Sequence, residues 1–222
     1  MMEIYAYGED GLTLWALQTK LDEILKKLGD NSHPSDCKLF FRPSFGRRGG
    51  QKSAQFGEFD FIILARDCLY IGESKWDGYS DARKTSIELR KEQLLRHQLF
   101  GFYVKHAFGP YFSKWDEPDW NKFVKEKSPW VEKVDKEEVR KPIAPTKSLL
   151  RKNLQEIMRI IKGHFIEQPH IRNVLLYLYS DDKADDEIPK VVNGDFILVP
   201  LKYHVGDLGN YISIKFEGVK FK

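Results

Sequence analysis

The chain has 222 residues, of which 41% are hydrophobic and 31% are charged. A chain of this length can bury a core of its own. Its charge is too high for a membrane protein, and its apolar content is too high for general disorder. The 36 basic and 33 acidic residues leave a net charge of +3, which neither marks nor excludes a nucleic-acid-binding protein.

No apolar run approaches the ~20 residues that cross a bilayer. The N-terminus has no basic segment leading into an apolar one, as a secretory signal would. The two cysteines, Cys37 and Cys68, lack paired metal-type spacing, which speaks against a disulfide framework or a zinc site. We therefore expect a cytoplasmic protein without a membrane partner.

The hydrophobic pattern predicts one α/β domain. Apolar residues at steps of three and four predict an amphipathic helix over residues 10–28, with Asp10 as its N-cap and Gly29 in its stop signal. The elements that follow are a strand at 37–42, a glycine-rich basic loop at 43–52, strands at 57–64 and 69–76 joined by a turn at Arg66 and Asp67, a helix at 81–106, a weakly periodic segment at 110–145, a helix at 147–165, a strand at 173–179, an acidic loop at 181–187, and strands at 195–203 and 211–217. The domain is expected to cover residues 1–222, with residues 110–165 as an insertion within it.

Two of the predicted strands carry the residues that point to chemistry. If the turn between them is centred at residues 66 and 67, Asp60 lies straight across from Glu73 and Glu58 lies across from Lys75. Opposed residues share a face of the sheet, with Cβ atoms ~5 Å apart. Glu73 and Lys75 share a face because side chains alternate along a strand. Two carboxylates and an ammonium are therefore predicted to converge on one patch.

Such a patch suits phosphodiester hydrolysis. Two carboxylates this close repel one another unless a cation lies between them. Mg²⁺ favours hard oxygen ligands and binds through one or two carboxylates together with substrate phosphate, and a neighbouring lysine can orient or deprotonate the attacking water. The alternative is a solvated cross-strand ion pair. Acids within strands that are otherwise strongly apolar are costly unless they are used, which favours the functional interpretation.

Asp60, followed by Glu73-Ser74-Lys75 on the next strand, resembles the PD-(D/E)XK phosphodiesterase superfamily, which has the restriction-endonuclease-like fold. The common core of that family runs helix, three-stranded meander, helix, strand, and residues 9–106 and 173–179 match this order. The family usually has Pro before its first Asp, where this chain has Phe59. The resemblance implies a mixed sheet flanked by helices, here with a helical insertion and extra C-terminal strands.

The resemblance also implies roles for individual residues. The catalytic residues would be Asp60, Glu73 and Lys75, with Lys75 acting near the attacking water. The metal would be held by the carboxylates of Asp60 and Glu73 and by the backbone carbonyl of Ser74. The expected cofactor is Mg²⁺, with Mn²⁺ as a substitute.

Many members of that family add an acid from the first helix. The candidates here are Glu9, Asp10, Asp22 and Glu23. On a helical wheel Glu23 faces solvent, whereas Glu9 flanks the apolar stripe at the start of the helix. Glu9 is therefore chosen as a further catalytic and metal-binding residue. The alternative is that Glu9 or Asp10 merely caps the helix.

Nucleic-acid contacts are expected from the glycine-rich loop, where basic side chains gain from counterion release on binding phosphates. The residues are Arg42, Arg47, Arg48 and Lys52. A hairpin tip that is basic only for solubility is the alternative.

On the predicted helix at 81–106, Gln93 and His97 share a face and could be accessory residues of the site, as some branches of the family place a Gln there. A surface polar pair is the alternative. Trp115, Trp120 and Trp130 could stack on bases, although packing in a core is the more common use of tryptophan.

Together these features predict a Mg²⁺-dependent nuclease, most simply a DNA endonuclease of restriction, defence or repair. RNA is the alternative substrate. Two other functions stay open, namely a non-cleaving nucleic-acid-binding module of the same fold and a structure-selective junction or flap nuclease. A homodimer is expected, because concerted cutting of both strands needs two sites. Aromatic residues such as Trp115, Trp120, Phe123 and Trp130 could supply its interface.

Overall fold

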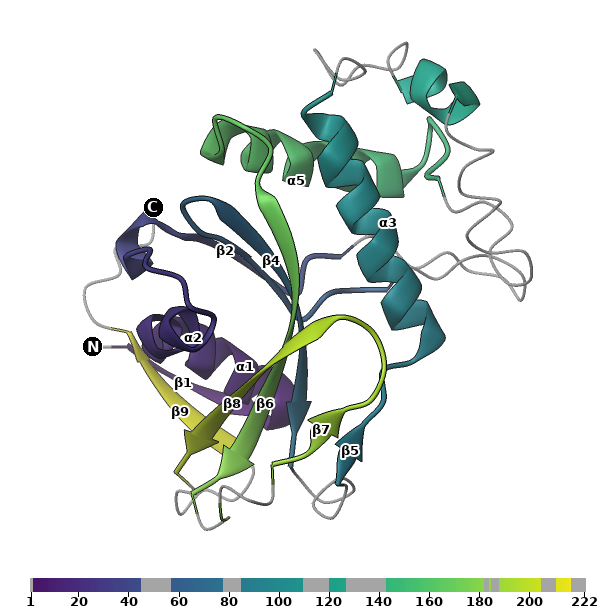
Figure 1. Ribbon diagram of the computed structural model, residues 1–222. Helices are drawn as coiled ribbons and strands as arrows, with labels where there is room; N and C mark the ends of the chain where they lie inside the picture. Colours follow the sequence, from purple (N-terminus) through teal and green to yellow (C-terminus); the bar gives the residue numbers. More distant parts are fainter. Residues whose placement is uncertain are drawn as a thin grey trace. The chain divides into compact units, whose positions relative to one another are not determined.

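The computed structural model describes residues 2–44, 57–77, 85–109, 120–126, 143–181, 184, 188–204 and 211–216. In this part the chain is an α/β protein with a mixed five-stranded sheet (Figure 1). It forms two compact units: the first comprises Met1–Phe41, Asp60–Glu88 and Arg172–Lys222, and the second comprises Arg42–Phe59 and Leu89–Ile171.

The five-stranded sheet has the order β2-β3-β4-β6-β8. Its strands are β2 (Lys38–Phe41), β3 (Phe61–Leu64), β4 (Cys68–Trp76), β6 (His170–Ser180) and β8 (Phe196–Tyr203). The first three form an antiparallel meander, whereas β6 and β8 run parallel to each other. Phe61 lies opposite Gly72 and Leu64 opposite Leu69, which confirms the register predicted from the turn at residues 66 and 67.

Two helices bury their apolar residues against this sheet. The single helix predicted over residues 10–28 is instead α1 (Gly8–Thr19) and α2 (Leu21–Lys27), separated at Lys20, whose φ of −121° is not helical. Their shared core with the strands includes Leu12, Ala16, Leu17, Leu21, Ile24, Leu25, Phe61, Ile63, Tyr70, Val174 and Leu176. The predicted N-cap Asp10 is wrong, because α1 begins earlier and its N-cap is Tyr7. Gly8 adopts a φ of +62° at this start.

A second, two-stranded sheet pairs the two ends of the described chain. β1 (Met2–Tyr7) and β9 (Tyr211–Phe216) are antiparallel and both contact α1 (Figure 1). The strand near 211–217 was expected and β1 was not. Its partner lies at the other end of the sequence, so no local turn signal announces the pair.

The segment after β4 differs from its prediction. The helix expected at 81–106 is α3 (Lys91–Ala107), preceded by β5 (Ser86–Ile87), which pairs in parallel with β7 (Lys190–Val191). The helix starts late because a capping box fixes its first turn, with the backbone N–H of Arg90 donating to Gln93 Oε1 at 3.0 Å.

The second unit contains α3, a helical stretch at 120–126 and α5 (Leu149–His164), which Ser148 caps through its side chain. Trp120 is fully buried, stacks on Tyr103 and donates its indole N–H to the Ala144 carbonyl at 2.8 Å. Phe123 is also fully buried. Trp120 is therefore not available for base stacking, and neither residue can supply a dimer interface. Trp115 and Trp130 lie outside the described residues.

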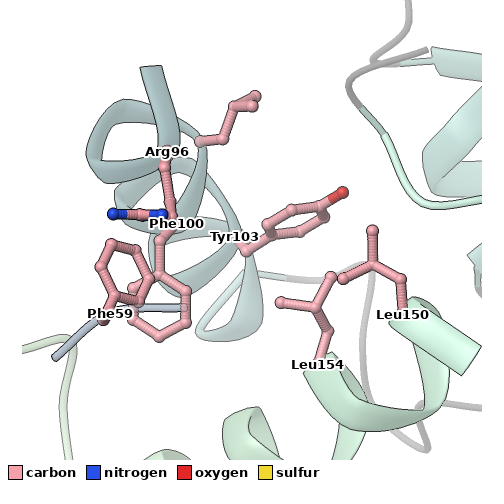
Figure 2. A pocket seen from close by; sticks show the side chains of 7 residues that line it. Phe59, Arg96, Phe100, Tyr103, Leu150 and Leu154 are labelled. Carbon is pink, nitrogen blue, oxygen red and sulfur yellow. The ribbon is translucent and has the colours of Figure 1, made fainter. Parts of the chain in front are cut away.

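A small cavity in the second unit lies between α3 and α5 (Figure 2). Its lining is apolar or aromatic apart from Arg96, whose guanidinium lies over the Phe59 ring at 5.1 Å. The lining residues are Phe59, Arg96, Leu99, Phe100, Tyr103, Leu150 and Leu154. Because no carboxylate is among the described residues that line this cavity, these residues do not supply the ligands that a hard metal ion needs.

None of the described helices is both long and apolar enough to span a bilayer. Cys37 and Cys68 are free thiols.

Gly72 is expected to be essential for the packing of β3 on β4. A Cβ added there would lie 2.0 Å from the Phe61 ring, so Gly72→Ala should destabilise the fold by at least about 1–3 kcal/mol through overpacking. Gly163→Ala is the control, since a Cβ there meets nothing within 4 Å and should stabilise α5 by about 0.5–1 kcal/mol. Chemical denaturation measures both; equal stability of the two variants would contradict the packing argument.

Candidate active site

Asp60 lies where β3 meets β4, and it bonds to both neighbours of Glu73. Its backbone N–H donates to the Gly72 carbonyl at 3.2 Å, and its Oδ2 accepts the Ser74 N–H at 2.7 Å. The regular ladder ends at the Phe61–Gly72 pair, so the carboxylate of Asp60 takes the place of a backbone partner for Ser74. The structure therefore brings Asp60 to the motif on β4, as the sequence predicted.

The centre of the motif on β4 is buried. Glu73 has only 2% of its surface exposed, and Ser74 has none. The Ser74 hydroxyl has no hydrogen-bond partner in the described part of the chain. Both backbone groups of Ser74, by contrast, form hydrogen bonds: its N–H donates to Asp60 Oδ2, and its carbonyl accepts from the Lys75 ammonium at 2.8 Å.

Glu9 joins this strand from the start of α1. Its Oε1 lies 3.6 Å from Lys75 Nζ, and its Oε2 accepts the Trp76 backbone N–H at 3.1 Å. These contacts direct the carboxylate toward β4, which favours a place in the cluster over the capping alternative. Asp60, Glu73, Lys75 and Glu9 are below called the carboxylate cluster.

Burial and mutual repulsion disfavour charge on these acids. Burial, followed by the Glu73 carboxylate, raises the pKa of Asp60 to about 7, although the Ser74 N–H opposes the shift. Burial also raises the pKa of Glu9, against the lowering effects of Lys75 and the Trp76 N–H. Three carboxylates facing one ammonium leave an excess of negative charge, which a divalent cation would neutralise.

The donor set fits Mg²⁺ held with few protein ligands. The carboxylates of Asp60 and Glu73 and the carbonyl of Ser74 are the hard oxygens that this ion prefers, and Mg²⁺ commonly takes one or two carboxylates and keeps several waters. Within the described ranges, no group of three or more His, Cys, Asp or Glu side chains is arranged to hold a metal. A site here would therefore rest on two carboxylates and the main-chain oxygen, with Glu9 directed to Lys75 and Trp76.

A hydrogen-bonded group fixes the end of β4 behind the cluster. The Trp76 indole N–H donates to Tyr203 Oη at 2.7 Å, and the Tyr203 hydroxyl donates to Asp77 Oδ1 at 2.8 Å. Asp77, which is buried, also accepts the Ser180 N–H at 3.0 Å. Sequence reasoning missed Asp77 and Tyr203, because Tyr203 reaches Trp76 and Asp77 from a distant strand and follows no spacing rule.

Tyr203→Phe should destabilise the protein by about 1–3 kcal/mol, because the Trp76 indole and Asp77 each lose a partner in a part-buried place. Tyr211→Phe is the control, since Tyr211 is 53% exposed and surface changes usually stay within about 0.5 kcal/mol. Thermal unfolding measures both. An unchanged midpoint for Tyr203→Phe would show that this group does not hold the strand.

The other predicted residues are placed as follows. Glu58 does not lie in the β3–β4 ladder, so the prediction that it opposes Lys75 is wrong; it forms a bridge with Ser44 and an ion pair of 2.7 Å with Arg42. Arg42 thus has an acidic partner.

Arg47, Arg48 and Lys52 lie outside the described residues. Gln93 accepts a hydrogen bond at the start of α3, and His97 is 3% exposed and packs edge-on against Phe59 at 4.9 Å. Gln93 and His97 make these contacts within the second unit, so their accessory role stays a prediction.

Comparison with known proteins gives no relative: no family model matches this chain, and no curated protein or solved structure matches it either.

Proposed function

We propose that this protein is a Mg²⁺-dependent nuclease with a restriction-endonuclease-like core that hydrolyses phosphodiester bonds in DNA. The observation that carries the proposal is the placement of Asp60, whose backbone and carboxylate bond to the residues on either side of the buried Glu73. The neighbouring Lys75 ammonium completes the combination of two acids and one lysine that phosphodiester hydrolysis uses.

The order of elements also supports the proposal. The chain runs through α1, the antiparallel meander β2-β3-β4, α3 and then β6. This is the order of helix, three strands, helix and strand that the resemblance implies. β1, β9 and the second unit's α5 would be additions to that core.

Each residue of the cluster would have a distinct task. Asp60, Glu73 and the Ser74 carbonyl would hold the metal, which when bound polarises the phosphate and lowers the pKa of water. Lys75 would orient the attacking water, whose oxygen forms the new bond to phosphorus as the bond to the leaving oxygen breaks. Glu9 would keep the Lys75 ammonium at the strand, since it lies 3.6 Å from it. Burial of Glu73 would keep bulk water away from the reacting groups.

The decisive experiment is incubation of the protein with plasmid, linear duplex and single-stranded DNA and with RNA, each with Mg²⁺, Mn²⁺ or EDTA. We expect cleavage of DNA with either metal and none with EDTA. Binding of DNA without cleavage under every condition would contradict the proposal and favour the non-cleaving module. Cleavage confined to RNA would support phosphodiester hydrolysis but would contradict DNA as the substrate.

Reversing two charges of the basic loop tests its role in binding. Arg47→Glu with Arg48→Glu should weaken DNA binding across sequences and reduce the salt slope by roughly one unit per lost phosphate contact. Binding titrations of an EDTA-treated sample at several salt concentrations measure the slope. An unchanged slope would assign the loop to solubility.

A further inference from the structure

The two-stranded sheet of β1 and β9 presents three tyrosines to solvent. Tyr5, Tyr7 and Tyr211 have 56%, 59% and 53% of their surface exposed. Tyr7 lies opposite Tyr211, and their rings meet edge to face at a centroid distance of 5.2 Å. Both strands contact α1, and on the other face Ile214 is fully buried while its cross-strand partner Ile4 is 39% exposed. Since side chains alternate along a strand and opposed residues share a face, the tyrosines form one aromatic row.

This aromatic row adjoins the carboxylate cluster. Tyr7 is the N-cap of α1, and Glu9, two residues further on, contacts Lys75. Gly8 lies between them, and a Cβ added at Gly8 would lie 3.6 Å from the Trp76 ring. The row and the cluster are therefore joined by the short segment from Tyr7 to Glu9.

The spacing of the row suits nucleobases. Residues two apart on a strand are separated by about 6.4–6.8 Å, which is about twice the 3.4 Å between successive stacked bases of one strand. The planar faces of Tyr5 and Tyr7 can therefore each meet a base of the same strand. Base–aromatic stacking needs no particular sequence, because every base has a flat face.

The area of the row favours a small occupant over a second copy of the chain. Aromatic side chains bury about 150–250 Å² each when they are fully covered. With little more than half of each surface exposed, the three tyrosines offer roughly 250–420 Å², against the ~800 Å² per partner of a standard protein interface.

We propose that Tyr5, Tyr7 and Tyr211 are a stacking platform for unpaired nucleobases, so that the substrate of the carboxylate cluster includes a single-stranded segment. This inference rests on the proposed nuclease function and names its substrate class. Duplex DNA keeps its bases stacked inside the helix, so it cannot use the platform.

The test measures binding in EDTA, where no cleavage occurs. The probes are a fluorescent ten-nucleotide single strand of DNA and the matching duplex, and fluorescence anisotropy gives both dissociation constants. Tyr5→Ala with Tyr7→Ala should weaken single-strand binding about tenfold or more, leave duplex binding within about twofold and leave the salt slope unchanged, because no charge is removed. Tyr5→Phe with Tyr7→Phe should bind like the wild type, since the ring stays. Leu149→Ala is the control for loss of an exposed apolar side chain, because Leu149 is 68% exposed.

Single-strand binding by the alanine variant at wild-type strength would overturn the platform. So would equal losses in the alanine and phenylalanine variants, which would assign binding to the hydroxyls. A wild-type dimer in light scattering that the alanine variant alone abolishes would identify a second copy as the occupant. If the tyrosines bind single strands and no metal supports cleavage, the stacking platform is supported and the nuclease proposal is wrong. If cleavage occurs and the alanine variant binds single strands normally, the nuclease proposal is supported and the stacking platform is wrong.

Discussion

Lys75→Met should lower the rate of Mg²⁺-dependent cleavage by about 10²–10⁴-fold, the usual loss when a positioned proton-transfer group is removed. Glu73→Gln should have an effect at least as large, since it removes one of two carboxylates that would hold the metal. Because both residues would act as one unit, the double variant should be little slower than the worse single variant. Single-turnover cleavage at saturating protein measures these rates.

Asp10→Asn is the matched control for these variants. Asp10 lies next to Glu9 on α1 but is exposed, so its replacement should keep the cleavage rate within about twofold. Circular dichroism and DNA binding of each variant show whether the fold and affinity are intact. Cleavage by Lys75→Met at the wild-type rate would contradict a role of Lys75 in the reaction.

In EDTA, Asp60→Asn should be more stable than the wild type at pH 8. The pKa of Asp60 is raised from 3.8 to about 7 in the folded state, first by burial and then by Glu73. The folded protein therefore holds a proton that the unfolded chain releases, so this contribution to stability is complete below pH ~4 and is lost as the pH rises through ~7. The loss amounts to about 2–4 kcal/mol, and the amide variant avoids it.

Urea denaturation of both proteins from pH 4 to pH 8 measures this difference. Glu9, whose pKa is also raised, acts in the same direction in both proteins and is one of the charges that raise the pKa of Asp60 in the wild type. Addition of Mg²⁺ at pH 8 should stabilise the wild type and have little effect on Asp60→Asn. A variant that is less stable than the wild type across the whole range would contradict the cause given for the raised pKa.

Asp30→Asn is the control, because it should change the free energy of unfolding in the opposite direction. Burial raises the pKa of Asp30, but hydrogen bonds from Ser32 and Tyr70 outweigh this effect and lower it. The stability that Asp30 contributes is therefore present above its unfolded pKa and lost on acidification. Asp30→Asn should lower the free energy of unfolding at pH 8, whereas Asp60→Asn should raise it.

The part of the site that the sequence predicted is the part set by local rules. A short turn at Arg66 and Asp67 determines the register of β3 and β4, and that register brings Asp60 to the strand of Glu73 and Lys75. The resemblance implied an acid from the first helix, and the periodicity of an amphipathic helix then favoured Glu9 over Glu23. The register itself needed only the alternation of side chains along a strand.

The part that the sequence did not predict depends on partners far along the chain. Tyr203 reaches Trp76 and Asp77 from a distant strand, and β1 pairs with β9, so neither leaves a pattern within one window of sequence. Asp60 lies just beyond the regular β3–β4 ladder, and its carboxylate accepts the Ser74 N–H. Strict alternation of side chains does not describe this contact. The late start of α3 depends on a cap between Arg90 and Gln93, which is not one of the usual capping pairs.

The pairing of β1 with β9 also sets when α1 gains its full support during synthesis. β1 is made first and its partner at Tyr211–Phe216 is made about 10–40 s later, at ribosomal rates of about 5–20 residues per second. Until then α1, which packs on both strands and carries Glu9, lacks part of its support. The support of α1, which carries Glu9, is therefore complete only after residues 211–216 have left the ribosome.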